Sequence, residues 1–83
     1  MDPNAALENW RNACAVIRAK GVDADDSLFY DDPNTIAEVC AERVREARAD
    51  KRKARGALCG WLARGGFEPA WTSKRERSYF IAD

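Results

Sequence analysis

The 83-residue chain has no histidine and only three cysteines. Histidine is the side chain that most often acts as a general base, so its absence removes the commonest route to acid–base catalysis. The cysteines (Cys14, Cys40 and Cys59) are an odd number and include no Cys-x-x-Cys pair, so they indicate neither a disulfide framework nor a four-ligand zinc site. We expect free, buried cysteines that act as small apolar side chains.

The glycine and serine motifs of the common enzyme classes are also missing. The chain has no phosphate-binding loop, no dinucleotide-binding glycine pattern and no nucleophile elbow. Its paired carboxylates, Asp25-Asp26 and Asp31-Asp32, lie in a polar connector that lacks the glycine and the distal glutamate of a calcium loop. An enzyme that used carboxylates alone would need a divalent ion in this connector. The sequence therefore predicts no enzyme, no catalytic residue, no cofactor and no metal.

Large apolar side chains are scarce. Leu, Ile, Val and Phe make up only 14 residues, whereas alanine alone makes up 15. A chain of this length buries about two-thirds of its unfolded surface, so the core is small. The formal net charge is zero, which argues against disorder. We expect one alanine-rich domain over residues 1–83. No apolar run could span a bilayer and the N-terminus lacks a signal-peptide pattern, so we expect a cytoplasmic protein without a membrane segment.

Two Asp-Pro pairs mark the starts of two predicted helices. Asp supplies a capping carboxylate, and the fixed φ of Pro suits the first helical position. The first helix is predicted over about 3–20, ending at Gly21. The second is predicted over about 33–64, roughly 45–50 Å long, ending at Gly65-Gly66 with Phe67 placed to contact the helix end. The first helix carries an apolar stripe of Leu7, Trp10, Cys14 and Ile17.

The remaining segments are an acidic connector over 21–32 and a tail over 65–83. Residues 28–30 could pack over the core or form a short helical turn, and residues 78–81 could be a short strand or an extended packing arm. We predict an all-α fold, an antiparallel helical hairpin with a long second helix and a C-terminal tail folding back. The first helix should cover the 36–44 and 54–62 parts of the second. Gly56 leaves open a kink or a break in that helix.

Charge is segregated along the chain and around the second helix. Residues 1–42 carry nine acidic and three basic side chains, and residues 43–83 carry eleven basic and five acidic ones. The halves could neutralise each other, or the basic half could face an anionic partner. On the second helix, one face carries an acidic ladder (Glu38, Glu42, Glu46 and Asp50). Another carries a basic ridge (Arg45, Arg48, Arg52 and Arg55). Like charges at this spacing are mildly destabilising, which favours a contact surface over a solvated face.

Between residues 45 and 57 no apolar side chain is larger than alanine. This stretch is therefore either an exposed rod or an alanine seam packed against another helix. Our leading interpretation is a non-enzymatic protein that binds through the ridge, either by self-association into a homo-oligomer or by docking to another protein. Charge would orient the partner, and Trp71 is a candidate aromatic anchor.

The alternative is a nucleic-acid-binding protein. Basic clusters at residues 51–55 and 74–77 could contact phosphates. The neighbouring acidic ladder, a pI near 6.3 and the lack of a recognisable nucleic-acid-binding motif argue against it.

Two segments together resemble a known group of small proteins. The chain opens with Asp-Pro-Asn at residues 2–4 and has a Trp-Leu-x-x-Gly-Gly-Phe-x-Pro segment at residues 61–69. Both are similar to segments of small accessory proteins encoded by bacteriophages of actinobacteria, a family mostly without assigned function. The resemblance implies an accessory protein in the cytoplasm of a bacterial host that acts by binding host or defence proteins. It implies no catalytic or binding residue.

Overall fold

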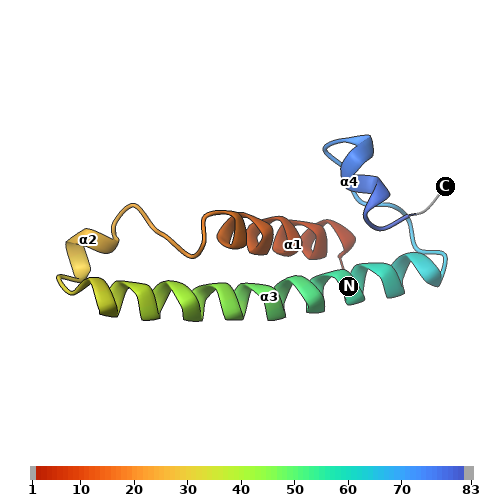
Figure 1. The fold of residues 1–83 in the computed structure, drawn as a ribbon. Coiled ribbons are helices and arrows are strands. Elements are labelled where there is room, and N and C mark those ends of the chain that lie inside the picture. The colour runs from red at the N-terminus through yellow and green to blue at the C-terminus, as the bar shows by residue number, and fades with distance from the viewer. Residues whose placement is uncertain (1, 82–83) are drawn as a thin grey trace.

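The computed structural model describes residues 2–81, apart from the side chain of Ser27. Its elements are α1 (Pro3–Arg18), α2 (Asp26–Phe29), α3 (Pro33–Ala63) and α4 (Lys74–Ser78), and these residues contain no strand. Helices α1 and α3 run antiparallel and pack side by side, and the tail returns over α1 (Figure 1). The predicted all-α helical hairpin is therefore confirmed.

Both long helices start as the Asp-Pro pairs predict. The Asp2 carboxylate accepts a hydrogen bond from the Asn4 backbone N–H at 2.9 Å, and Asp32 accepts one from Asn34 at 3.0 Å. A proline follows each capping residue. Each cap satisfies a backbone donor that the first helical turn leaves unpaired.

Helix α1 ends two residues before its predicted end. Lys20 and Gly21 both have positive φ angles, 57° and 75°, so the chain leaves the helix there. The Gly21 N–H donates back to the Val16 carbonyl at 2.9 Å, which closes the helix end. A side chain at Gly21 would also collide with the Cys40 carbonyl group, so this glycine lets the connector lie directly on α3.

Helix α3 is continuous through Gly56, so the break considered there does not occur. At its end Gly65 has a φ of 83°, and the Gly66 N–H donates to the Trp61 carbonyl at 3.0 Å. Phe67 packs edge-on against Trp61 with 5.4 Å between the ring centres, and its carbonyl accepts the Trp61 indole N–H at 2.9 Å. The predicted contact of Phe67 with the helix end is confirmed.

The molecule is elongated because α3 has 31 residues and α1 only 16. Its extents are 50 × 20 × 19 Å and its radius of gyration is 15.5 Å. A compact chain of this length would have a radius of gyration of about 12 Å. One partner helix of about 24 Å therefore covers only about half of α3.

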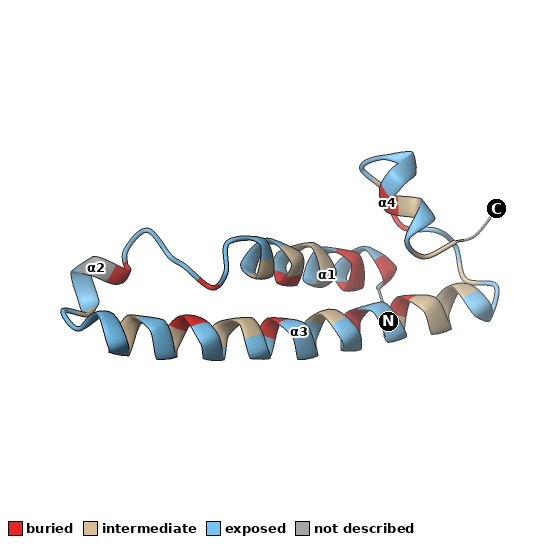
Figure 2. Ribbon diagram, in the orientation of Figure 1, coloured by how far each residue is buried: buried red, intermediate tan, exposed pale blue. Residues whose placement is uncertain are grey.

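The core lies where α1, α3 and the tail meet. Leu7 and Leu58 are fully buried at its centre. Around this centre pack Ala6, Trp10, Leu62, Trp71 and Phe80. The middle of α3 continues the contact as an alanine seam, in which Ala47 and Ala54 are buried. The buried positions of α3 lie on the side that carries α1 (Figure 2). Of the two options for this stretch, the structure has the close-packed seam, formed within one molecule.

The prediction that α1 also covers residues 36–44 is wrong. The connector occupies that part of α3, because α1 is too short to reach it. Asp26 of α2 is buried there and accepts a hydrogen bond from Arg43 at 2.7 Å. Leu28 and Phe29 are 77% and 76% exposed, so the connector forms the short helical turn and does not pack these side chains over the core.

Residues 78–81 form neither a strand nor an extended arm. Ser73 caps the short helix α4 by accepting a hydrogen bond from the Glu76 N–H at 3.1 Å. A turn after α4 then presents Phe80, which stacks on Trp71 at 5.5 Å and meets Trp10 edge-on at 5.0 Å. The Ser73-x-x-Glu76 pattern favours this helix start and outweighs the β-propensity of the aromatic residues that follow.

Candidate functional site

The basic ridge lies on the exposed surface of α3. Its four arginines are all exposed, and no hydrogen bond or ion pair holds them to another described residue. Other arginines are engaged within the molecule. Arg11 pairs with Glu76 at 2.6 Å, Arg43 with Asp26 at 2.7 Å, and Arg77 with Glu68 at 2.8 Å. The ridge is thus positive charge that the monomer does not use internally.

The acidic ladder lies along the other edge of the same outward face. At 100° per residue, the direction opposite the buried stripe of α3 passes near Ala49 and Gly56, between ridge and ladder. This outward side of α3 is exposed along the helix (Figure 2). Ala49 and Gly56 are small residues between a basic edge and a mainly acidic edge, which also carries Lys53. Another helix that lay along this face would meet charges of both signs.

The two flanks of the hairpin differ in charge. A groove of about 690 Å³ opens on one flank between α1, α3 and α4. Its basic side chains come from all three helices. They are Arg11 and Arg18, Lys51 and Arg55, and Arg75. A second groove of about 650 Å³ lies on the other flank. Five alanines line it, and its two acidic side chains, Glu46 and Asp50, are balanced by two basic ones, Arg43 and Lys53. The first groove unites Arg55 of the ridge with Arg75 of the tail, which are 20 residues apart in the sequence.

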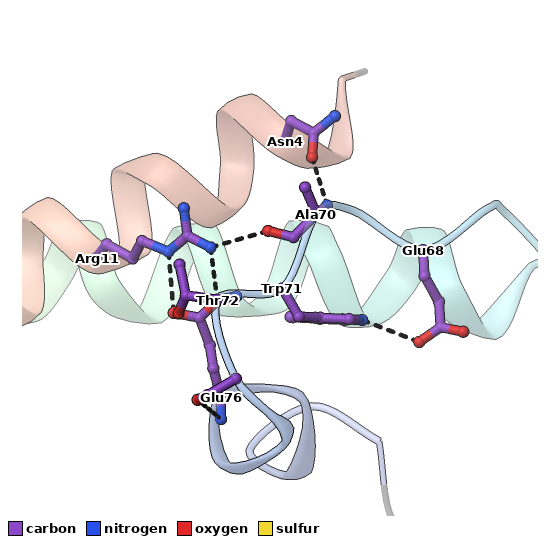
Figure 3. A network of polar contacts seen from close by, with 8 residues as sticks. Asn4, Arg11, Glu68, Ala70, Trp71, Thr72 and Glu76 are labelled. Atoms are coloured by element: carbon purple, nitrogen blue, oxygen red, sulfur yellow. Dashed lines mark hydrogen bonds and ion pairs between the residues drawn. The ribbon is translucent and has the colours of Figure 1, made fainter.

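Glu76 fastens the tail to α1 and so shapes the first groove (Figure 3). Its carboxylate accepts two hydrogen bonds from the Arg11 guanidinium, at 2.9 and 2.6 Å, and one from the Thr72 N–H at 3.0 Å. Arg11 also donates to the Ala70 carbonyl at 3.0 Å, and the Ala70 N–H donates to Asn4 at 2.7 Å. These contacts hold residues 70–76 against α1.

The same contacts determine the charge of Glu76. Hydrogen bonding from Arg11 lowers the pKa of Glu76 to about 2, although burial opposes the shift. The pairing also raises the pKa of Arg11 above its ordinary value. Among the described residues, Glu76 is the only acidic side chain that lines the groove, and Arg11 already neutralises it. The groove therefore keeps the charges of Arg18, Lys51, Arg55 and Arg75.

Trp71 is half-buried and packs on the core. Its ring stacks on Phe80, and its indole N–H donates to Glu68 at 2.9 Å (Figure 3). The structure therefore gives Trp71 an internal packing role. Its use as a partner anchor stays a prediction, and it lies on the tail rather than on the ridge.

The cysteines and carboxylates do not gather into a metal-binding constellation in the part of the chain that is described. There, no three His, Cys, Asp or Glu side chains are grouped so as to hold a metal ion. Cys14, Cys40 and Cys59 are free, as expected, but only Cys40 is buried, and Cys14 and Cys59 are partly exposed. The Cys40 thiol lies 3.8 Å from the Asp26 carboxylate. No described helix has both the length and the apolar content that a membrane span requires.

Sequence reasoning missed the groove because its residues come from distant segments. The seven-residue spacing of Arg11 and Arg18 was a usable signal, since it places both on one face of the first helix. The Ser73-x-x-Glu76 pattern was another, since it predicts the start of α4. The pairing of Arg11 with Glu76 joins residues 65 apart and had no local signal.

Comparisons with known proteins add no relative. No protein-family model matches the chain, and neither a curated protein nor a solved structure matches it. The resemblance of residues 2–4 and 61–69 to actinobacteriophage accessory proteins therefore stays a prediction.

Proposed function

We propose that this protein is a non-enzymatic interaction protein that binds a second copy of itself through the outward face of α3. The observation that carries the proposal is the contrast among the arginines. Those of the ridge are exposed and without a partner in the described chain, whereas Arg11 and Arg43 are paired internally. A continuous helix presents the ridge and the ladder at overlapping heights, so each edge finds its complement on another copy.

Because the ridge and the ladder overlap in height along α3, the α3 helices of the two copies should lie parallel to each other. In a two-fold pair with the axis along the helices, the basic edge of one copy faces the acidic edge of the other. Arg45 then lies within about one residue of Glu46 in height, and Arg48 lies between the heights of Glu46 and Asp50. An antiparallel pair would bring basic edge against basic edge, which costs energy. Helix α1 lies on the opposite side of α3 and does not obstruct the contact.

Paired charge reversals test this proposal. Arg48→Glu with Arg52→Glu places two acidic side chains on the ridge, where they would face the ladder of another copy. Glu42→Arg with Glu46→Arg places two basic side chains on the ladder, where they would face the ridge. We expect the wild-type chain to dimerise at low salt, each double variant alone to be monomeric, and an equimolar mixture of the two variants to form a heterodimer. Light scattering coupled to size-exclusion chromatography measures the masses, and circular dichroism checks that helicity is retained.

A wild-type chain that stays monomeric at every concentration would contradict self-association. So would a dimer that persists in the Arg48→Glu, Arg52→Glu variant. A mixture that fails to associate would contradict the parallel pairing. If the chain is phage-encoded, as its resemblance implies, we propose that the dimer acts in the cytoplasm of a bacterial host.

Nucleic-acid binding is the second candidate, and one observation favours it. The basic tail does not extend the ridge, but Arg75 joins Arg55 in the groove between α1, α3 and α4.

A further inference from the structure

The groove between α1, α3 and α4 collects basic side chains that have no counter-charge. Arg18, Lys51, Arg55 and Arg75 line it, and none of them forms an ion pair with a residue that the structure describes. Glu76, the one carboxylate that lines the groove in the described part of the chain, is paired with Arg11. Four such charges around one groove repel one another, and bound anionic groups would relieve that repulsion.

The groove also has aromatic walls. Trp10 and Tyr79 line it, and their ring centres are 5.7 Å apart. Tyr79 is 50% exposed, so part of its ring is available to a ligand. Exposed rings beside basic side chains are the usual means of holding a base and its phosphates together. The groove volume of about 690 Å³ is in the range of small-ligand sites.

We propose that this groove binds nucleotide units, with phosphates on Arg18, Lys51, Arg55 and Arg75 and the base against Tyr79. The unit is either a free nucleotide or part of a single-stranded nucleic acid, since both offer the same chemistry. The site shares Arg55 with the proposed dimer contact, whereas Arg45 and Arg52 lie outside the groove and Arg18 and Lys51 lie outside the ridge. Substitutions that leave Arg55 in place therefore test the two proposals separately.

Matched double substitutions distinguish specific binding in the groove from non-specific attraction of anions to a positively charged surface. Arg18→Gln with Lys51→Gln removes two charges from the groove, and Arg45→Gln with Arg52→Gln removes two charges from the ridge. The probes are ATP, tripolyphosphate and a short oligothymidylate, titrated into the full chain at low salt by calorimetry. We expect the groove variant to bind ATP at least about tenfold more weakly, because two charged contacts are lost. The ridge variant should stay within about twofold of wild type.

The three probes distinguish the two sources of the nucleotide. Binding of ATP alone identifies a free nucleotide, and binding of the oligothymidylate alone identifies a single strand. Tyr79→Ser should weaken ATP binding and leave tripolyphosphate binding unchanged, with a thermal melt to confirm folding. The proposal is overturned if no probe binds, or if both double variants lose affinity equally. Tripolyphosphate binding as tight as ATP binding would overturn the assignment of the base.

Protection of a cysteine locates the ligand directly. Cys14 lines the groove and Cys59 does not, and both are partly exposed. Saturating ATP should slow alkylation of Cys14 by iodoacetamide and leave Cys59 unaffected, as measured by mass spectrometry of tryptic peptides. Equal protection of both cysteines, or of neither, would place the ligand elsewhere and overturn the site.

Discussion

Glu76 has the largest pKa shift among the titratable side chains described. Its carboxylate accepts hydrogen bonds from Arg11 and from the Thr72 N–H, and its backbone N–H caps α4 through Ser73. One residue thus starts the last helix, fastens the tail to α1 and neutralises Arg11. The pKa values of Asp26 and Glu68 are lowered as well, mainly by the Asp23 backbone N–H and by Arg77 respectively.

Replacing Glu76 tests how much this contact contributes. Glu76→Gln keeps the shape and removes the charge, so we expect a loss of about 2 kcal/mol in unfolding free energy at neutral pH. In the wild type, the folded carboxyl has a pKa of about 2 against an ordinary value of 4.5. Its stabilisation is therefore complete above about pH 4.5 and is lost as the pH falls towards about 2.

Urea denaturation at several pH values measures this dependence. The Glu76→Gln variant should lose less stability on acidification than the wild type, while keeping the part that comes from Asp26 and Glu68. An identical pH dependence in both proteins would show that the Arg11–Glu76 pair contributes nothing in solution.

Trp10 combines an unfavourable polar environment with favourable ring contacts. Its indole N–H is buried and has no hydrogen-bond partner in the part of the chain described. Such a donor costs about 1–3 kcal/mol. The ring contacts with Phe80 and Tyr79, at 5.0 and 5.7 Å, explain what offsets that cost.

The elements of this fold follow from local signals. The Asp2-Pro3 and Asp32-Pro33 starts and the Gly21 and Gly65 ends all function as their residue types predict. The covering of residues 36–44 could not be predicted in this way. It depends on the length of α1 and on the pairing of the buried Asp26 with the half-buried Arg43, 17 residues apart.

Replacing Gly56 or Gly21 by alanine should change the stability of the fold in opposite directions. Nothing lies within 4 Å of a Cβ added to Gly56, so Gly56→Ala should stabilise α3 by about 1 kcal/mol. At Gly21 the φ is positive and the added Cβ meets the Cys40 carbonyl, so Gly21→Ala should destabilise by about 2 kcal/mol or more.

Chemical denaturation measures both changes. The Arg48→Glu, Arg52→Glu background keeps dimerisation from contributing to the result. A destabilising Gly56→Ala in that background would mean that α3 bends at Gly56 in solution.

At the scale of the whole molecule, a very small core brings α1 and the C-terminal tail together on α3. Leu7 and Leu58 are covered by Trp71 and Phe80, so α1, α3 and the tail complete one cluster. With so few large side chains, none of these segments has a core of its own. We therefore expect the chain to unfold as one cooperative unit.

A pair of phenylalanine truncations tests this cooperativity. Phe80→Ala should lower the unfolding free energy by about 3 kcal/mol and shift the melting of the whole helical signal. Phe67 is 66% exposed and packs on Trp61 at the end of α3, so Phe67→Ala should cost about 1 kcal/mol.

Circular dichroism during thermal unfolding distinguishes the outcomes. Equal effects of the two truncations would contradict the central position of Phe80. Separate melting of part of the helical signal would contradict a single cooperative unit.

The sequence by itself determined the two long helices, their caps and the separation of charge around α3, because each depends on residues within a few turns of one another. Tertiary structure decided which charges stay available. It buried Ala47 and Ala54 against α1, although the alanine-rich stretch was equally consistent with an exposed rod. It also paired Arg11 with Glu76 and gathered Arg18, Lys51, Arg55 and Arg75 around one groove. Those pairings depend on how far α1 reaches along α3 and where the tail returns, and no local pattern encodes either.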